Sequence, residues 1–587
     1  MSYDRIRLES ANDSFILDPV VQSGQKEVLF IPRNGAAGAP ISFNTRVVDA
    51  ATNTAQGGEE IFGLLGIIHL LRGPYLVVIT GRTAVARIKE RTIWMMTKHK
   101  LIPFSTSLRL TPVEQQDEER YISMLNTLLG HGRFYFAHGM DITRKLQYAF
   151  EENSNNFSHT KVDERFFWNR FLAEPLIHSN EKLDRWILPV MMGFIQSESA
   201  TISNKRFDFI LISRRNWKRA GTRYNVRGID NQGNVANNVE TEQIVVYEGT
   251  HVSYVILRGS IPVFWSQKAN LKYKPKPVLT RSEQESLAAC RKHFDELFSN
   301  YGSQTVVNLI DHKGGELLLG YSFENQMREC DTSKIKYVAF DFHKEVHGMK
   351  YERLSVLLDQ IREEVNQQQF FVSNKEGQIN SKQRGTCRVN CIDNLDRTNV
   401  VQSLISRYVL NRQLIQLGII QPTDDFKRYD GFEKTFKNIW ANNGDAMSVQ
   451  YTGTGALKAD YTRTGKRSFR GNIDDGINSL KRYYLNNFSD GFQQDSFDLL
   501  LGNYKVDRDS GSPFKALERE TQIFFAVIVA LLLFVALALF TPTEADFSYT
   551  VKFLFFAFWV GLGYLGGKTL LSYGSHIVNS PKLVLEH

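Results

Sequence analysis

The sequence predicts a mixed α/β protein, with a β-rich N-terminal domain packed on an α/β domain and a C-terminal transmembrane hairpin of two helices. Residues 1–185 alternate short apolar runs with turn signals, which is typical of strands. From residue 186 onward, strand-like and helix-like runs alternate. Near the C-terminus, two apolar runs are long enough to span a membrane, and the first covers Ile523–Phe540.

The expected boundaries follow these changes of pattern. They give an N-terminal domain over 1–185, an α/β domain over 186–504, a polar linker over 505–520, two transmembrane helices over 521–572 and a cytosolic tail over 573–587. Lysines and arginines flank both outer ends of the apolar pair, which places both ends in the cytosol. Lys552, on the inner side, opposes this orientation.

The net charge and the sequence motifs indicate which kind of molecule the protein binds. The net charge of +8 favours an acidic partner, and both anionic lipid and nucleic acid fit that description. Because the sequence has no RNA-binding signature, zinc-ligand spacing or repeat, we expect a lipid partner, no nucleic acid, no metal and no cofactor. Four cysteines in 587 residues are too few for a disulfide scaffold and indicate a reducing compartment.

Three arginines precede the chemical motif at every fourth position: Arg219, Arg223 and Arg227. The spacing predicts that they share one face of a strand, which forms a hairpin with a second strand over 235–246. On that face they would either neutralise a polyanionic ligand or pair with Glu240 and Glu242 across the hairpin. The sequence leaves both interpretations open.

The segment Cys387–Val401 carries the strongest chemical signal. Cys391 and Arg397 form a C-x5-R loop between a predicted strand, Gly385–Asn390, and a helix that begins near Thr398. A loop this short can aim successive backbone N–H groups at one centre, which makes a nest for a phosphate. Arg397 would close the ring with a bidentate fork, and Cys391 would attack phosphorus as a thiolate whose pKa these groups lower.

The remaining loop residues receive roles in this scheme. The candidates for phosphate binding are Ile392, Asn394, Leu395 and Thr398. Asp393 and Asp396 are poor neighbours for a phosphate unless one of them is protonated and donates to the leaving oxygen. His343 is a further candidate acid or base, or simply the end of a strand.

The run NCIDNLDRTN resembles the signature of the Sac-domain phosphoinositide phosphatases, and the similarity covers nearly all of the chain. It extends over further stretches, at 219–230, 235–245, 258–267, 339–345, 451–458, 462–467 and 482–504. One position departs from the family pattern: Asn394 stands where a second cysteine is common. A redox role for that second cysteine therefore does not carry over.

The resemblance implies a membrane-embedded phosphatase with a C-x5-R phosphatase loop in its α/β domain and a non-catalytic N-terminal domain. It implies hydrolysis of phosphatidylinositol 4-phosphate through a phosphocysteine, with the 3-phosphate and the 3,5-bisphosphate as lesser substrates. We therefore expect endoplasmic reticulum and Golgi membranes, a cytosolic catalytic domain, and partners in membrane trafficking or at contact sites. Basic residues beyond the loop would contact the inositol ring or form ordinary turns: Lys458, Arg463 and Lys466.

Similarity to the myotubularin phosphatases, which share C-x-D-x-x-D-R, favours Asp396 over Asp393 as the general acid. Two other functions fit parts of the pattern. A membrane-anchored protein tyrosine or dual-specificity phosphatase would share the loop but would need neither the hairpin nor two loop carboxylates. A catalytically silent lipid-binding tether would not need the Cys391 and Arg397 pair.

Overall fold

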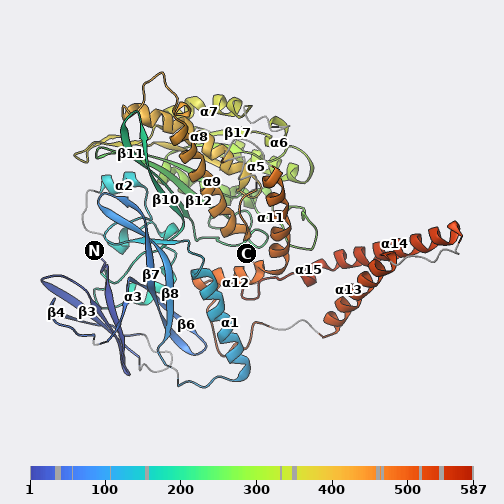
Figure 1. The fold of residues 1–587 in the computed structure, drawn as a ribbon, viewed down its shortest axis with the longest axis horizontal. Helices are drawn as coiled ribbons and strands as arrows, with labels where there is room; N and C mark the ends of the chain where they lie inside the picture. The colour runs from blue at the N-terminus through green and yellow to red at the C-terminus, as the bar shows by residue number, and fades with distance from the viewer. Residues whose placement is uncertain are drawn as a thin grey trace.

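A computed structural model describes the chain except for some segments, namely residues 1, 34–40, 56, 106, 153–157, 331–332, 347–352, 458–462, 464–468, 515–518, 541–547 and 585–587. It also leaves the side chains of 519–523 and 537–540 undescribed. The mixed α/β class with a β-rich N-terminal part is confirmed. In Figure 1 the N-terminal strands form the lower part of the body, and the later strands and helices form the upper part.

A five-stranded antiparallel sheet opens the chain. Its strand order is β4-β3-β2-β1-β5. The strands are β1 (Ile6–Ser10), β2 (Ser14–Pro19), β3 (Gln25–Pro32), β4 (Asn44–Asp49) and β5 (Glu59–Ile61). Apolar side chains alternate along β2 and β3, and Phe15, Leu17 and Leu29 are fully buried in one apolar cluster.

A second sheet of 13 strands runs through the body in the order β17-β16-β20-β13-β12-β11-β10-β9-β8-β7-β6. Off this path, β18 (Phe371–Ser373) pairs with β13, and β19 (Ile379–Ser381) pairs with β18. Its antiparallel part contains β6 (Gly63–Leu70), β7 (Gly73–Ile88), β8 (Arg91–Pro103), β9 (Phe134–Ala137), β10 (Met191–Ile202), β11 (Lys205–Arg215), β12 (Val239–Tyr247) and β13 (Thr250–Arg258). Strand β9 pairs with β10 through Tyr135 and Met191, so the sheet is continuous across the boundary expected near residue 185.

The parallel part of the sheet carries the candidate site. It contains β16 (Ser303–Asn308), β17 (Ile335–Ala339) and β20 (Gly385–Asn390), with β20 in the centre between β13 and β16. Helices α5 (Leu317–Glu329) and α7 (Leu354–Gln368) connect these strands, as parallel pairing requires. Every residue of β20 is buried, because helices and neighbouring strands cover both of its faces.

Four further helices complete the body and the cover of the site: α1 (Pro112–Leu129), α4 (Glu283–Tyr301), α8 (Asp396–Gln416) and α9 (Asp430–Thr452). Helix α8 follows the motif loop directly and ends at Gln416, with Leu417 as its C-cap, and Gly418 then takes a left-handed φ of 65°. The helix therefore begins two residues before the expected start and ends where glycine predicts it.

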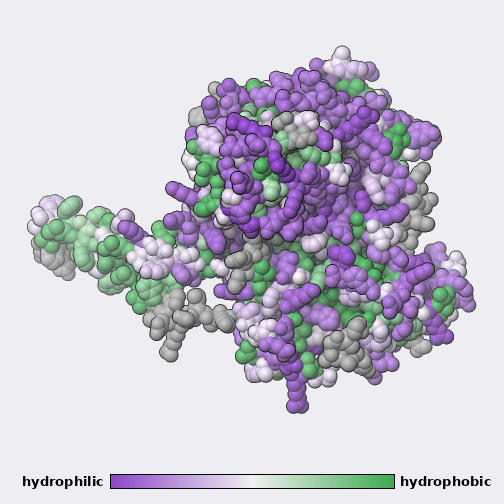
Figure 2. All heavy atoms as spheres, turned by 180° about the vertical axis from the view of Figure 1, so that it is seen from behind, coloured by the Kyte–Doolittle hydropathy of each residue, from purple (hydrophilic) through white to green (hydrophobic). Residues whose placement is uncertain are grey.

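The C-terminal helices are α11 (Phe469–Phe488), α12 (Asp490–Leu501), α13 (Arg519–Phe540), α14 (Tyr549–Ser572) and α15 (Gly574–Ile577). Within the described residues, α14 is the helix long and apolar enough to cross a membrane, and Phe524–Ala536 of α13 is a shorter apolar helix. The two pack antiparallel, with Gly566 against Leu532 and Phe524 against Tyr573. They project from the body in Figure 1, and apolar spheres gather on them in Figure 2. The expected pair of spans is thus found in part.

The described part of the expected linker packs on the body. The side chain of Arg508 pairs with Glu114 at 2.5 Å. The ring of Phe514 lies 5.2 Å from the ring of Tyr121, and the guanidinium carbon of Arg120 lies 4.2 Å from the centre of the Phe514 ring. Residues 505–514 are therefore held along α1 and do not form a free tether.

Candidate active site

The motif loop lies where β20 ends and α8 begins, beside a cavity of about 260 Å³. Cys391, Asp393, Asp396 and Arg397 all line this cavity. The carboxyl ends of parallel strands are the usual location of ligand sites in α/β sheets. The strand–loop–helix arrangement that the sequence predicts is therefore present, and it opens into a space of ligand size.

Asn394 shapes the loop around the candidate nucleophile. The N–H of Cys391 donates to Asn394 Oδ1 at 3.2 Å, and Asn394 takes a φ of 55°. Asparagine tolerates this left-handed conformation better than most residues. Buried Arg258 donates to the Asn394 carbonyl at 3.4 Å and to Asn399 Oδ1 at 3.0 Å. The position that departs from the family pattern thus acts through its amide, and Cys391 is only 3% exposed.

The other proposed phosphate contacts are also in the loop. The Ile392 carbonyl accepts a hydrogen bond from Arg227 at 3.1 Å, and the Leu395 side chain is buried in the apolar core. The Thr398 hydroxyl is buried and has no hydrogen-bond partner among the described residues. Thr398 is fully buried and does not line the cavity.

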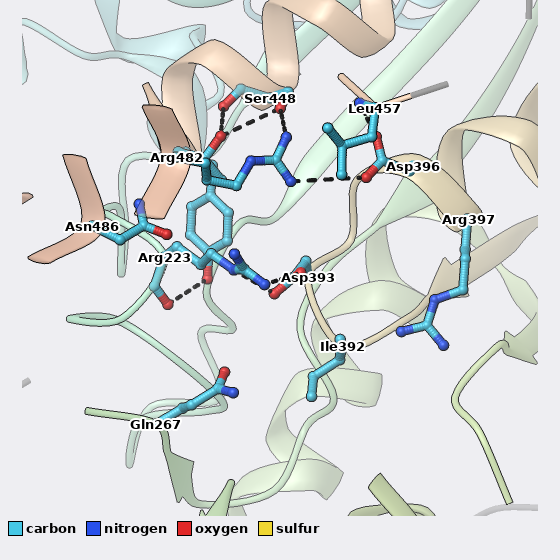
Figure 3. Close-up of polar contacts among 12 residues, drawn as sticks. Arg223, Gln267, Ile392, Asp393, Asp396, Arg397, Ser448, Leu457, Arg482 and Asn486 are labelled. Carbon is cyan, nitrogen blue, oxygen red and sulfur yellow. Dashed lines mark hydrogen bonds and ion pairs between the residues drawn. The ribbon is translucent and has the colours of Figure 1, made fainter. Parts of the chain in front are cut away.

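Asp393 is held by two arginines from a distant segment, and Figure 3 shows one of them, Arg223, beside it. Arg223 donates to both of its carboxylate oxygens, at 3.0 and 2.7 Å, and Arg227 donates to one at 2.8 Å. Burial alone would raise the pKa of Asp393, but the two guanidinium groups outweigh it and hold the pKa well below its usual range. Asp393 is therefore ionised and has no proton to donate.

This pairing corrects the expected role of the arginine segment. Residues 219–227 do not form a strand, and Arg219 takes a left-handed φ of 57° that an extended strand excludes. Glu240 and Glu242 are bound by Arg214, each at 2.8 Å. The expected pairing of these two carboxylates with the three evenly spaced arginines is therefore wrong. Strand β12 pairs instead with β11 and β13.

Asp396 has different surroundings from Asp393. It is the first residue of α8, and one carboxylate oxygen accepts the N–H of Leu457 at 2.8 Å. Arg482 lies 3.9 Å from the other oxygen, too far for a hydrogen bond. Burial is the main influence and raises the pKa of Asp396, although Arg482 and the Leu457 N–H oppose it. Asp396 is therefore the loop carboxyl that retains a proton more readily.

Arg397 does not close the loop ring in this structure. It donates to both oxygens of Glu316, at 3.1 and 3.0 Å, and to the carbonyl of Leu309 at 3.0 Å. Asp311 lies 3.3 Å away and also contacts His343 at 2.7 Å. Figure 3 shows Arg397 on the far side of the loop from Asp396. The guanidinium group of Arg397, which the sequence predicts to bind a phosphate, therefore binds carboxylates in this structure.

The other predicted basic contacts lie elsewhere. Arg219 donates to the carbonyls of Arg227 and Gly228, which stabilises its own segment. Arg463 pairs with Asp445 at 2.8 Å and does not line the cavity. Lys458 and Lys466 lie outside the described residues. Only Arg223, of the three evenly spaced arginines, reaches the cavity wall.

Arg482 is the main site residue to which the sequence assigned no role. It donates to Thr454 Oγ1 at 3.0 Å and to Ser448 Oγ at 3.1 Å, which fixes its head group near Asp396 (Figure 3). It lies within 482–504, one of the stretches that resemble the Sac-domain phosphatases. Tyr273 and Lys274 also line the cavity.

In the described part of the chain, no group of three or more His, Cys, Asp or Glu side chains is arranged to hold a metal ion. The positive groups around the loop are arginines instead, and a guanidinium group binds a phosphate without a metal.

Comparison with known proteins identifies the family. A family model described as the SacI homology domain matches residues 62–347. Phosphatidylinositol-3-phosphatase SAC1-B of Danio rerio is 40% identical over 594 residues, which cover 99% of this chain and 98% of that protein. SAC1 of Drosophila melanogaster is 38% identical over 592 residues, with 99% and 97% covered. SAC1 of Saccharomyces cerevisiae is 36% identical over 559 residues, with 92% and 88% covered. The chain therefore belongs to the SacI homology family, as its motif predicts.

Proposed function

We propose that this chain is a membrane-anchored phosphoinositide phosphatase that hydrolyses phosphatidylinositol 4-phosphate, with the 3-phosphate and the 3,5-bisphosphate as lesser substrates. The observation that carries the proposal is that Cys391, Asp396 and Arg397 line the same cavity at the end of a parallel strand. The relatives are named phosphatidylinositol-3-phosphatases, which supports a phosphoinositide as the substrate. The order of preference among phosphate positions rests on the family resemblance.

The reaction would proceed in two steps. The Cys391 thiolate attacks phosphorus, a sulfur–phosphorus bond forms, and the bond to the inositol oxygen breaks as Asp396 transfers its proton to that oxygen. Water then attacks phosphorus while Asp396 takes its proton, which releases inorganic phosphate and the thiolate. Loop N–H groups and a guanidinium group would stabilise the charge on the equatorial oxygens.

Arg397 would exchange partners when the substrate binds. Its present partners, Glu316 and Asp311, satisfy the same donors that a phosphate would use. Asp393 is neutralised by Arg223 and Arg227, so its charge would not oppose phosphate entry strongly.

The membrane part of the proposal rests on α14, on the antiparallel α13 and on the flanking basic residues. We place both ends of the pair in the cytosol, with the enzyme on endoplasmic reticulum and Golgi membranes and with trafficking or contact-site proteins as partners. Fractionation of cells that express the tagged chain, with protease protection of each end, tests this placement.

The substrate assay tests the enzyme itself. Purified full-length protein is presented with each phosphoinositide isomer in vesicles and with phosphotyrosine peptides, and released phosphate is measured. The proposal expects turnover on the lipids, highest on the 4-phosphate, and little on the peptides. Faster turnover on the peptides would favour a protein phosphatase instead.

A further inference from the structure

Helix α11 exposes a continuous apolar stripe. The stripe consists of Phe469, Ile473, Ile477, Leu480, Tyr484 and Phe488. Their spacing of three and four residues places them on one side of the helix. Leu480 is 73% exposed and Phe469 is 82% exposed. A contiguous apolar surface of this kind marks an interaction site in a folded protein.

The opposite side of the same helix forms part of the cavity. Ser479, Arg482, Tyr483 and Asn486 all line it. Tyr483 also donates to the Leu271 carbonyl at 2.7 Å, which ties α11 to the exposed loop of Tyr273 and Lys274. A membrane or protein that binds the apolar stripe would therefore be separated from the candidate active site only by helix α11.

The chain that leaves α14 returns directly to α11. The Asn579 N–H donates to the carbonyl of Asn487, in the last turn of α11, at 2.7 Å. Its side-chain oxygen accepts the N–H of Phe492 at 2.8 Å. Gly574 packs so closely on the Asn270 carbonyl that a Cβ there would lie 2.4 Å from its oxygen. The end of α14 and the end of α11 are thus held together.

The tail beyond this point is docked as well. Asp495 accepts the N–H groups of Lys582 and Leu583, at 2.8 and 2.9 Å, and the Leu583 side chain joins the core of the body. Residues 505–514 also pack on the body, so described segments that precede and follow the helical pair both contact the body. In Figure 1 α11 lies crosswise to α14, with α15 at its lower end.

We propose that the stripe of α11 lies in the headgroup region of the same bilayer that α14 spans, and that it holds the mouth of the cavity at the membrane surface. This inference rests on the membrane anchor proposed above. A helix crosswise to a membrane span, and joined to its end, lies along the bilayer surface. Exposed basic residues would attract anionic lipid. Lys274 lines the cavity, and Lys272 and Lys276 are its exposed neighbours in the chain. Arg470 and Lys481 are exposed on α11 itself.

A fluorescent label tests the depth of the stripe without any enzyme assay. Leu480→Cys is labelled with an environment-sensitive dye in a Cys391→Ser background, where the other native cysteines are buried. The full chain is reconstituted in phosphatidylcholine vesicles that contain phosphatidylserine, and lipids with a quencher high on the acyl chain are added. We expect blue-shifted emission and quenching at position 480. The same label at Val47→Cys, on the N-terminal sheet, should remain in water.

The outcomes separate the inference from the proposals on which it rests. If the vesicles float with the protein but the label at 480 behaves as the label at 47 does, the stripe is not in the bilayer and the inference is overturned. A stripe that binds a protein partner would give that result. If the protein does not float with the vesicles, the anchor and the inference fail together. An inactive phosphatase would leave the fluorescence result unchanged.

A second measurement uses turnover. The double variant Ile477→Glu and Leu480→Glu should lower the rate on phosphatidylinositol 4-phosphate in vesicles by at least about tenfold, because two charged side chains resist entry into the bilayer. Its rate on a short-chain, water-soluble form of the lipid should stay within about twofold of the parent enzyme. The matched control, Val20→Glu and Val47→Glu, changes two exposed apolar residues far along the chain and should leave both rates unchanged. An equal loss on both substrates would contradict the inference.

Discussion

Asp393 and Asp396 lie three residues apart in one loop and have opposite electrostatic surroundings. Two guanidinium groups contact Asp393 within 3.0 Å, whereas Asp396 has one backbone donor and an arginine at 3.9 Å. The pKa of Asp393 is lowered and that of Asp396 is raised. The comparison teaches that distant partners, and not position in the motif, decide which carboxyl can serve as an acid.

Removal of the proposed nucleophile, Cys391, should have the largest effect. Cys391→Ser is expected to lower turnover by at least about 10³-fold, because a serine hydroxyl in this pocket stays protonated and attacks phosphorus poorly. Binding of phosphatidylinositol 4-phosphate vesicles should be retained. Single-turnover assays together with vesicle flotation measure both quantities. Appreciable turnover by the variant would remove Cys391 from its role.

A substitution of Arg397 tests whether its guanidinium fork takes part in the reaction. Arg397→Lys should lower kcat by about 10²-fold, because an ammonium group cannot replace two parallel donors on a phosphate. Steady-state kinetics on the water-soluble substrate separate kcat from KM. A variant with near-normal kcat would mean that Arg397 acts only in its pairs with Glu316 and Asp311.

The two carboxylates should differ in what they contribute to stability. Asp393→Asn should lower the free energy of unfolding by about 3 kcal/mol, because it leaves Arg223 and Arg227 buried without their partner. Asp396→Asn should change it by less than about 1 kcal/mol. Denaturant unfolding of the detergent-solubilised chain measures both variants. Similar losses would contradict the difference in environment.

The pH dependence of stability should have opposite signs for the two groups. The pKa of Asp393 is depressed in the folded state, so its contribution is present above the unfolded pKa of about 3.9 and is lost as pH falls. The pKa of Asp396 is raised, so its ionised form costs stability as pH rises above the unfolded value. Unfolding at several pH values should show that Asp396→Asn removes this cost.

The smallest expected effect concerns Arg482. Its charge lowers the pKa of Asp396, so Arg482→Met should raise that pKa further. The alkaline limb of kcat/KM should then move to higher pH, by less than about one unit. A merely structural role would lower the rate without moving the limb. A pH profile on the water-soluble substrate distinguishes the two results.

The sequence predicted the parts of the site that are contiguous. Strand β20, the loop and helix α8 form one segment, so spacing within the motif was enough to place Cys391, Asp396 and Arg397. The family and the mixed α/β class followed from the same stretch and from the apolar runs. Gly418 also predicted where α8 ends, since the helix stops at Gln416 and Leu417 is its C-cap.

The missed parts depend on contacts between distant segments. Arg223 lies 170 residues before Asp393 in the chain, and the even spacing of the arginines suggested a strand that the left-handed backbone of Arg219 rules out. Arg482 reaches Asp396 from α11, which no local pattern could reveal. The polar composition of 505–520 predicts a linker but does not reveal that Phe514 packs on α1.

One measurement tests the central claim, that Asp396 is the proton donor and Asp393 is not. Asp396→Asn is assayed on the lipid, whose inositol oxygen needs a proton to leave, and on an aryl phosphate, whose leaving group does not. We expect a loss of about 10²-fold or more on the lipid and of less than about tenfold on the aryl phosphate. Equal losses on both substrates would contradict the claim and would make Asp396 a structural residue.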